Sequence, residues 1–285
     1  MIHRFWSSPL RFLAKALYAA LAPTIPLPKD GVRIICISDT HNTQLKLPDG
    51  DILLHAGDLT QSGSPEELQS QIDWLDSQPH KFKVVIAGNH DLCLDDSKKE
   101  AYDENNKAVQ INWRSLIYLK DTSTTLRLQG GRPLKIYGSP WTPKHGNWAF
   151  QYPRAGQDPW KGSIPDDVDI LITHGPPKHH LDLGYLGCAF LLQEVHAKPP
   201  PLHVFGHIHA GYGRRSVEWD SFELAYERTI ADDGSWFDLA RMFIFGAFRI
   251  RGNVNGGSRS TVFVNASAIG GFRDEERREA ITVVL

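Results

Sequence analysis

The sequence has few of the features that mark several classes of protein. Its 285 residues include only three cysteines (Cys36, Cys93 and Cys188), and no two of them form a CxxC pair. We therefore expect no disulfide framework, and the pattern favours a reducing, cytoplasmic location. The formal net charge of −2 shows no excess of positive charge. A nucleic-acid partner is not expected, because such proteins bind phosphates through clustered lysine and arginine.

A long uncharged run is also missing, even from the most distinctive apolar stretch, residues 1–28. This segment has no acidic residue, but Arg11 and Lys15 interrupt it, whereas a transmembrane helix needs about 20 mostly apolar residues. The same interruption argues against a secretory signal. The helical spacing of its leucines favours an amphipathic surface helix or a mitochondrial presequence, and a loosely packed extension is the alternative. Contact with a membrane surface and a mitochondrial location therefore remain open for residues 1–28.

The remainder, residues 29–285, is predicted to be a single α/β domain. Short apolar runs that end in polar residues or glycine indicate buried strands, and helical patterns separate several of them. A hairpin and two late strands follow, which predicts two packed mixed β-sheets flanked by helices. Residues 214–260 are rich in aromatic residues and read as a helical insertion. The main strand predictions are residues 33–38, 52–57, 83–88, 169–175 and 202–209, and the main helix predictions are residues 64–79 and 184–200.

Two of these runs end in pairs of polar side chains. Asp39 and His41 follow residues 33–38, and His207 and His209 end the run at 202–209. In extended chain, residues two apart point to the same side, roughly 6.5–7 Å apart. Each pair can therefore reach one metal ion, or each member can reach one of two neighbouring ions.

Three further runs end in polar side chains of the same kinds: Asp58 follows the second run, Asn89 and His90 the third, and His174 the fourth. Because the carboxyl ends of parallel strands share one edge of a sheet, these groups are expected to converge on one crevice. A glycine stands beside the polar residue in each motif, which we interpret as a means for the backbone to turn sharply.

The mixture of imidazole, carboxylate and amide suits Mn²⁺, Fe or Zn²⁺, and it has too many nitrogens for Ca²⁺. Two ions would need a shared ligand, and Asp58 is the candidate, because a carboxylate has two oxygens. Two carboxylates do not neutralise two dications, so the site would attract an anionic phosphate ester. The sequence therefore predicts two divalent ions and a small phosphate-ester substrate.

The blocks SDTHN, GDLT, GNHD, THGPP and GHIHAGYG, in this order, resemble the calcineurin-like metallophosphoesterase superfamily. The longer stretches ILLHAGDLT, GSPWTP and HVFGHIHAGYG resemble its branch of metallophosphoesterase-domain-containing phosphodiesterases, of the class III cyclic-nucleotide type. The similarity covers residues 33–213 and the block VNAS near the end. It implies a four-layer α/β/β/α sandwich.

The resemblance also implies a role for each site residue. Asp39, His41 and His209 would hold one metal ion, Asn89, His174 and His207 would hold the second, and Asp58 would lie between them. A hydroxide bridging the ions would attack phosphorus. His90 would protonate the leaving alkoxide. Asp91 would either orient the His90 imidazole or cap the following turn.

The function implied is hydrolysis of small phosphodiesters, with nucleotide-like esters and cyclic nucleotides first. A phosphomonoesterase or nucleotide hydrolase on the same site is the alternative, and a non-catalytic scaffold on the same fold is a third. Gln61 and Ser62 stand where serine/threonine protein phosphatases of the superfamily carry an Asp-Arg pair, which argues against a phosphoprotein substrate. Trp141 and Trp148 are read as packing under a loop, or as stacking on a substrate ring.

Overall fold

The structure is a computed structural model, and it describes residues 9–21, 30–101, 110–128, 131–250 and 259–285. The chain divides into two compact units. One comprises residues 1–26 and 216–262 and is called here the helical unit. The other comprises residues 27–215 and 263–285 and is called the sheet unit. The boundary between them falls within two strands, and each unit is described by itself.

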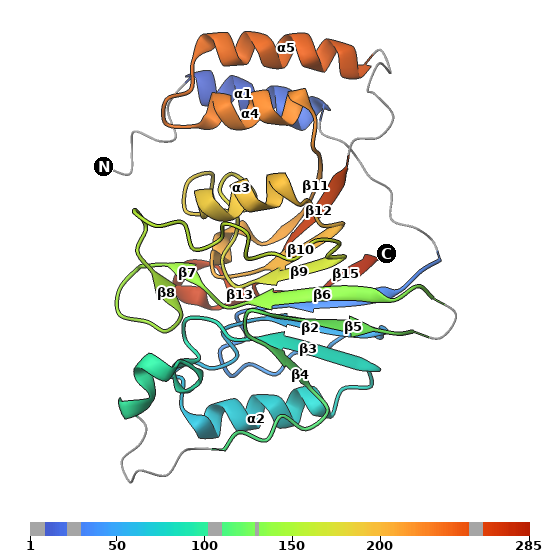
Figure 1. Cartoon of the computed structure of the whole chain (residues 1–285), viewed down its shortest axis with the longest axis vertical. Helices are drawn as coiled ribbons and strands as arrows, with labels where there is room; N and C mark the ends of the chain where they lie inside the picture. Colours follow the sequence, from blue (N-terminus) through green and yellow to red (C-terminus); the bar gives the residue numbers. More distant parts are fainter. Residues whose placement is uncertain (1–8, 22–29, 102–109, 129–130, 251–258) are drawn as a thin grey trace. The chain divides into compact units, whose positions relative to one another are not determined.

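The sheet unit contains a five-stranded sheet in the order β15-β1-β2-β3-β4 (Figure 1). The four strands β1 to β4 are parallel, and β15 lies antiparallel to β1 at the edge. Their bounds are β1 Arg33–Ile37, β2 Ile52–Ala56, β3 Phe82–Ile86, β4 Ile117–Leu119 and β15 Ile281–Val284. The predicted strands 33–38, 52–57 and 83–88 are thus present and adjacent.

Helix α2 (Pro65–Asp76) covers one face of this sheet. Ser64 caps it by accepting a hydrogen bond from the backbone N–H of Glu67 at 3.2 Å, and Pro65 occupies its first turn, as these residue types favour. The stripe formed by Leu68, Ile72 and Leu75 is fully buried against the alternate strand residues that point to the same face. Apolar residues repeat every three to four positions in the helix and at every second position in the strands. Each pattern places its apolar side chains on one face, and the two faces pack into a common core.

The second sheet has six strands in the order β11-β12-β10-β9-β6-β5. Strand β9 runs parallel to both β10 and β6, and the β5–β6 pair is the antiparallel hairpin expected around residue 130, although residues 129–130 lie outside the described part. The bounds are β5 Thr122–Leu126, β6 Leu134–Ser139, β9 Ile170–Thr173, β10 Leu202–Phe205, β11 Gly213–Glu218 and β12 Ser260–Asn265.

The two sheets pack against each other, with β2 in contact with β10 and β3 in contact with β6. Helix α3 (Ala189–Ala197) lies on the far side of the second sheet (Figure 1). It begins five residues later than the start of the predicted segment. The sheet unit is therefore mixed α/β, with two large sheets flanked by helices, as predicted. Its short elements are β7 Thr142–Pro143, β8 Gln151–Tyr152, β13 Ile269–Gly270, β14 Glu276–Arg277, and the 3-10 helices Leu92–Leu94, Asp96–Ala101, His209–Gly211 and Phe272–Asp274.

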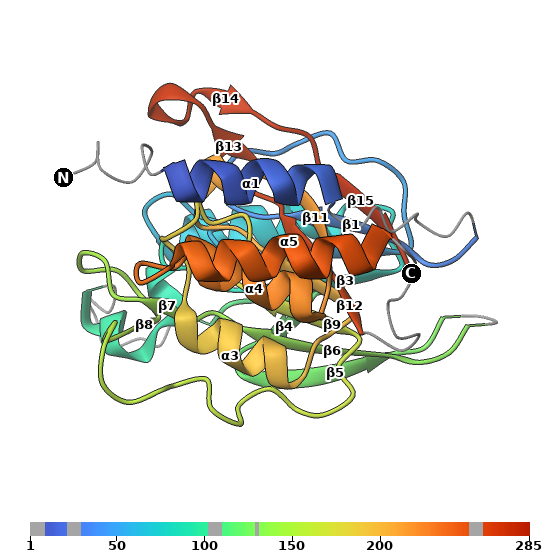
Figure 2. The ribbon, with the colours of Figure 1, turned by 90° about the horizontal axis from the view of Figure 1, so that it is seen from above.

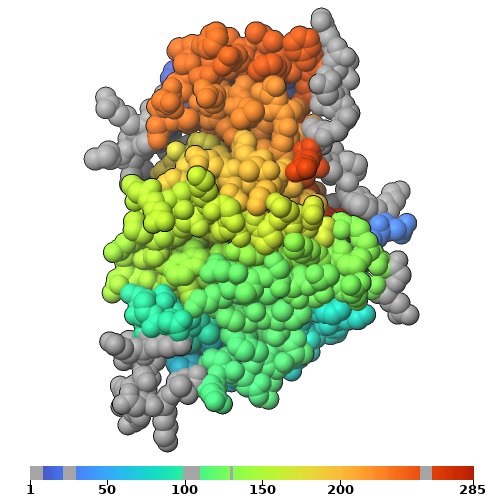
Figure 3. Space-filling model, in the orientation of Figure 1, coloured from blue at the N-terminus to red at the C-terminus, as the bar shows by residue number. Residues whose placement is uncertain are grey.

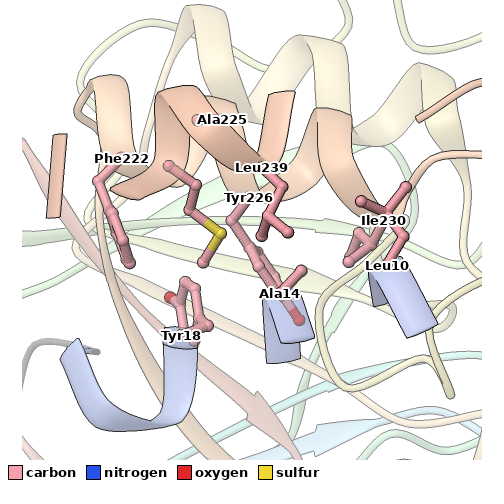
Figure 4. Close-up of a cluster of buried hydrophobic side chains, with 9 residues drawn as sticks. Leu10, Ala14, Tyr18, Phe222, Ala225, Tyr226, Ile230 and Leu239 are labelled. Atoms are coloured by element: carbon pink, nitrogen blue, oxygen red, sulfur yellow. The ribbon is translucent and has the colours of Figure 1, made fainter. Parts of the chain in front are cut away.

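The helical unit is built from α1 (Pro9–Leu21), α4 (Ser221–Ile230) and α5 (Trp236–Ile250), which all contact one another (Figure 2). Figure 4 shows its core, in which Tyr18 of α1 stacks on Phe222 and lies 4.1 Å from the ring of Tyr226. The Tyr18 hydroxyl donates to the Glu223 carboxylate at 2.6 Å. The buried phenol of Tyr18 therefore has its hydrogen-bond partner within this core.

This arrangement differs from the organisation expected from the sequence. The N-terminal segment and the insertion were read separately, but the part of each that the structure describes belongs to one three-helix unit. Arg11, one of the two basic residues that interrupt the apolar stretch, bonds the carbonyl of Ala231 at 3.0 Å and the carboxylate of Asp232 at 3.1 Å. Among the described helices, none has the length and the hydropathy that a membrane crossing requires.

Candidate metal centre

The candidate ligands lie at the carboxyl ends of five strands drawn from both sheets. Asp39 and Asp58 each lie two residues beyond the end of a strand, β1 and β2 respectively, and Asn89 follows β3. From the second sheet, His174 follows β9 directly, and His207 lies two residues beyond β10. Because parallel strands end at the same edge of a sheet, their following loops are neighbours in space.

One group of side chains consists of Asp39, His41 and His209, whose potential ligand atoms lie within 4.8 Å of one another. The Nε2 atom of His209 is 3.5 Å from Oδ1 of Asp39. The Asp39 side chain is fully buried and the His41 side chain nearly so. These three residues are the set that the family resemblance implies for the first ion.

A second group consists of Asp58, His174 and His207, again with potential ligand atoms within 4.8 Å of one another. Nε2 of His174 lies 3.3 Å from Oδ2 of Asp58 and 3.0 Å from Oδ1 of Asn89. The same Oδ2 of Asp58 is 3.7 Å from Nε2 of His41, which belongs to the first group. One carboxylate oxygen therefore faces both groups, as a shared ligand must.

The residues present fit a pair of divalent transition-metal ions. Both ring nitrogens of His41 are buried and have no hydrogen-bond partner among the described residues. A buried polar group without a partner costs free energy, and a bound cation would remove this cost. The surrounding imidazoles, carboxylates and amide are also the ligand types that Mn²⁺, Fe and Zn²⁺ accept.

Neighbouring groups fix the direction of each ligand. The Nδ1–H of His174 donates to the carbonyl of Ala56 at 2.9 Å, which directs Nε2 toward Asp58. Nδ1 of His209 bonds the carboxylate of Asp274 at 2.8 Å. Such partners set the tautomer and orientation of a metal-binding histidine.

Asp39 is held in the same way by groups from the second sheet. Ser267 donates a hydroxyl hydrogen bond to Oδ2 of Asp39 at 2.8 Å, and the backbone N–H of His207 donates to both carboxylate oxygens at 3.0 Å. In the sequence, Ser267 stands out only as part of the block VNAS. Asp274 was not predicted, because no spacing or strand end points to it.

The cluster sets the protonation of its members. Although burial opposes ionisation, the nearby histidines hold the pKa values of Asp39 and Asp58 below their usual range. Burial lowers the pKa of His207 to about 3 and also lowers that of His41, so both imidazoles are neutral at pH 7.

His174 and His209 behave differently. Burial alone would lower their pKa values, but the adjacent carboxylates, Asp58 and Asp39 respectively, raise both to about 9. These two imidazoles therefore carry a proton in the metal-free protein. A metal ion that binds their Nε2 atoms must displace that proton.

His90 lies beside both groups, and its orientation is fixed by neighbours other than those expected. Its Nδ1–H donates to the carbonyl of Gln61 at 2.9 Å. Its ring stacks on Trp148 with 4.1 Å between centroids and meets the ring of His41 edge-on at 4.6 Å. These contacts leave Nε2 of His90 as the nitrogen that can exchange a proton with a substrate.

Asp91 requires a correction, because it does not orient His90. It is fully buried, and its carboxylate accepts hydrogen bonds from the backbone N–H groups of Gly88 at 2.8 Å and Thr60 at 3.0 Å, and from the Thr60 hydroxyl at 2.7 Å. Burial and the charge of Asp58 raise its pKa to about 6. Asp91 therefore ties the loop after β3 to the loop after β2, and the Gln61 carbonyl takes the role expected of it.

The glycines in the motifs also act differently from the expectation. Only Gly57, at φ +95°, is a site glycine in the left-handed region; Gly88 and Gly206 are not. A Cβ atom on Gly206 would collide with the carboxylate of Asp39, and one on Gly88 would collide with Asp58. These two glycines are required because ligands approach the backbone closely.

Comparison with known proteins shows the family of the chain. The family model described as calcineurin-like phosphoesterase matches residues 32–211. The chain is 50% identical over 285 residues to a protein of Emericella nidulans named probable rhamnogalacturonate lyase C. It is 42% identical over 214 residues to human metallophosphoesterase domain-containing protein 1, and 40% identical over 219 residues to a Caenorhabditis elegans protein of the UPF0046 group.

These relatives are longer than the part that matches. The match covers 98% of this chain but 27% of the Emericella nidulans protein, and 66% of this chain with 64% of the human protein. The Caenorhabditis elegans match covers 66% of this chain and 54% of that protein. Among solved structures, the protein TT1561 of Thermus thermophilus matches 66% of this chain and 85% of its own, with 14% identity and a TM-score of 0.45. The family model covers well over half of the chain, and the chain belongs to the calcineurin-like phosphoesterase family.

Proposed function

We propose that this protein uses two divalent metal ions to hydrolyse small phosphodiesters, with cyclic nucleotides as the first candidates. The observation that carries the proposal is the position of Asp58, one of whose oxygens faces both His41 and His174. Membership of the family supports a metal-dependent phosphoesterase. The preference for diesters rests on the resemblance of the sequence blocks to one branch.

The residues that would hold the ions are the two groups described above with Asn89. When bound, such ions lower the pKa of water toward neutrality and neutralise charge on phosphoryl oxygens. Asp58 supports the position of the general acid as well, because it accepts the backbone N–H of His90 at 2.7 Å.

His90 is the proton donor in this proposal. Since the carbonyl of Gln61 accepts from Nδ1, the proton delivered to the leaving oxygen comes from Nε2. The stacked ring of Trp148 restricts rotation of the imidazole. A positioned general acid contributes typically 10²- to 10⁴-fold to the rate of such a reaction.

The test combines metal analysis with a panel of substrates. Metal-depleted protein reloaded with Mn²⁺ is assayed on 3′,5′-cAMP, bis(p-nitrophenyl) phosphate and p-nitrophenyl phosphate. Close to two ions per chain and a preference for the diesters are expected. A preference for the monoester would support the phosphomonoesterase alternative, and turnover by metal-free protein in chelator would overturn the proposal.

Asp58→Asn is the decisive variant, with Asp49→Asn as its matched control. Asp49 is an exposed carboxylate in the turn before β2, so its neutralisation removes the same charge outside the site. Asp58→Asn is expected to lower both metal content and turnover, while Asp49→Asn retains both. A fully loaded, inactive wild type would instead favour a scaffold.

We also propose that the helical unit contacts a lipid surface. Phe237, Ile244 and Phe248 share one face of α5, since they are spaced by seven and four residues, and they are 65%, 55% and 49% exposed. Arg241 lies on the same face, over the ring of Phe237. An apolar face with a basic residue is typical of helices that lie in a membrane interface.

Co-sedimentation with neutral and anionic vesicles tests this contact. The double substitution Phe237→Ser with Phe248→Ser should weaken binding more than tenfold, because burial of each ring contributes about 1.5–3 kcal/mol. Phe272→Ser, in the sheet unit, is the control, since Phe272 is 79% exposed. Equal binding by the double variant, or no binding by the wild type, would contradict the proposal.

A further inference from the structure

The sheet unit holds a cavity of about 500 Å³ whose lining contains none of the candidate metal ligands. Four aromatic side chains contribute to its walls: Tyr137, Trp141, Tyr152 and Trp160. Among the described residues that line it, Asp121 alone is charged. Figure 3 shows the face on which the segment around residues 150–165 packs beside the β5–β6 hairpin. The cavity is large enough for a small organic ligand.

Hydrogen bonds hold the walls in place. The indole N–H of Trp160 donates to the hydroxyl of Tyr152 at 2.9 Å, and that hydroxyl donates to Sγ of Cys188 at 2.9 Å. Cys188 in turn caps α3. On the other side, the indole N–H of Trp141 donates to Asp121 at 2.8 Å. A rigid wall reduces the entropy that a ligand must overcome on binding.

The same bonds use up nearly all the donors of the lining side chains. Ser139 donates its hydroxyl hydrogen to Asp121 at 2.7 Å, and Ser163 donates to a backbone carbonyl at 2.8 Å. The hydroxyl of Tyr137 is the one donor in the lining with no partner among the described residues, and this side chain is 4% exposed. Burial and the charge of Asp121 raise the pKa of Tyr137 to about 12, so the phenol stays neutral.

This inventory selects one class of ligand. An anion would meet a carboxylate and no positive side chain. A sugar or another polyol would find a single free donor for its many oxygens. An organic cation needs neither a positive side chain nor a free hydrogen-bond donor. Aromatic rings and a carboxylate attract it directly, as in sites for quaternary ammonium groups. The nearest lysine in sequence, Lys120, pairs with Asp96 at 3.3 Å.

The cavity lies close to the metal centre. Ser139, at the end of β6, pairs with Thr173 on the adjacent strand, and Thr173 immediately precedes His174. Neighbouring strands lie about 4.8 Å apart. Trp141, in the cavity wall, directly precedes β7, and Trp148, which stacks on His90, lies between β7 and β8. The short segment between β6 and β8 therefore contributes to both places.

We infer that the cavity binds a quaternary alkylammonium group, and that this group is carried by the phosphodiester hydrolysed at the metal centre. The second half of the inference rests on the proposed function; the first half does not. The substrate class is thus a zwitterionic phosphodiester, with its phosphate at the metal ions and its cationic end among the aromatic rings.

Binding to the intact, metal-loaded protein tests the first half. Choline is compared with 3,3-dimethylbutan-1-ol, which has the same shape and no charge, by tryptophan fluorescence and calorimetry. Choline should bind at least about tenfold more tightly, because contact of the cation with the aromatic rings adds to the attraction of Asp121. Equal binding of the two compounds, or no binding of choline, would overturn the inference.

Variants then locate the site. Asp121→Asn should weaken choline binding about tenfold, a change that corresponds to the loss of one charge partner. Asp49→Asn removes an equal, exposed charge outside the cavity and should change binding less than twofold. Tyr137→Phe keeps the ring and should also have little effect. A loss in Tyr137→Phe equal to that in Asp121→Asn would indicate recognition of a hydroxyl group and would overturn the assignment of a cation.

Kinetics test the second half and separate it from the proposed function. The ratio of kcat/KM for p-nitrophenyl phosphocholine to that for bis(p-nitrophenyl) phosphate should exceed one and fall about tenfold in Asp121→Asn, through KM. A ratio that Asp121→Asn leaves unchanged, with both esters hydrolysed, overturns the second half while the proposed function stands. Hydrolysis of neither ester by loaded protein overturns the proposed function and the second half with it, whereas choline binding still decides the first half.

Discussion

The helical unit and the sheet unit differ in how much apolar surface they expose and in how their buried ionisable groups are grouped. Of the large apolar side chains exposed in the described residues, nine lie in the helical unit and four in the sheet unit. Both units bury ionisable groups, and Glu223 and Glu227 are examples in the helical unit. In the sheet unit such groups form a cluster, in which Asp39, Asp58 and His174 are at most 2% exposed. Exposed apolar surface and buried charge both oppose stability. We interpret the exposed apolar surface of the helical unit and the buried cluster of the sheet unit as features kept for function, because each lowers the free energy of unfolding.

The two units also differ in how many residues have a positive φ angle. Four candidate ligands of the sheet unit, Asp39, His41, Asp58 and His207, have φ between +42° and +65°. Among the described residues of the helical unit, none has a positive φ. A residue other than glycine in this region costs about 1–3 kcal/mol and persists where the surroundings enforce it. The packing of the sheet unit therefore holds candidate ligands in strained backbone conformations, and the described residues of the helical unit show no such strain.

The largest effect that sharpens this contrast is expected from His90→Ala. Turnover of diesters with poor leaving groups should fall 10²- to 10⁴-fold, because the leaving oxygen then lacks its proton donor. Activated aryl diesters should lose far less, since their leaving groups need little protonation. Steady-state kinetics on an alkyl and an aryl diester measure the difference. Equal losses on both would remove the general-acid role.

A change in the helical unit should leave chemistry untouched. Met242 is fully buried in the core of α1, α4 and α5, and Met242→Ala should reduce the stability of that unit by about 2–5 kcal/mol through the cavity it creates. Limited proteolysis and thermal unfolding report the loss, while kcat of the folded protein is expected to stay within about twofold. A large fall in kcat at unchanged metal content would show that the two units do not act separately.

The strands of the sheet unit and the convergence of its candidate ligands could be predicted from the sequence for one physical reason. Short apolar runs define buried strands, and polar residues directly after them must lie at one edge, so Asp39, Asp58 and His174 could be found without coordinates. Asp274 could not be found, because it bonds His209 across 65 residues from an irregular segment. Asp91 was misjudged, since adjacency to His90 in sequence says nothing of which backbone groups its carboxylate reaches. The association of residues 9–21 with α4 and α5 was missed because amphipathicity identifies an apolar face but not its partner.

Asp274→Ala tests the missed residue with a smaller expected effect. Loss of the hydrogen bond to Nδ1 frees the His209 ring, and metal affinity should fall about 10- to 100-fold. Competition with a chromogenic chelator measures the metal affinity. Asp233→Ala, in the helical unit, removes one exposed carboxylate and is the control. If the two variants bind metal equally well, the Asp274 contact does not position the ligand.

The smallest effect concerns the pH dependence of stability, which should reside in the sheet unit. His203 donates from Nε2 to the Thr173 hydroxyl at 2.8 Å, and burial holds its pKa well below 6.5. His203 therefore stays neutral in the folded chain at a pH at which it is protonated in the unfolded chain. As a result, the free energy of unfolding decreases as the pH falls below 6.5. Between pH 7 and 5.5 this one group should remove about 1 kcal/mol from the free energy of unfolding. Urea unfolding at the two pH values measures this change in the wild type and in His203→Gln. The free energy of unfolding of the wild type should fall by about 1 kcal/mol more than that of the variant. An equal fall in both would mean that His203 can be protonated in the folded protein.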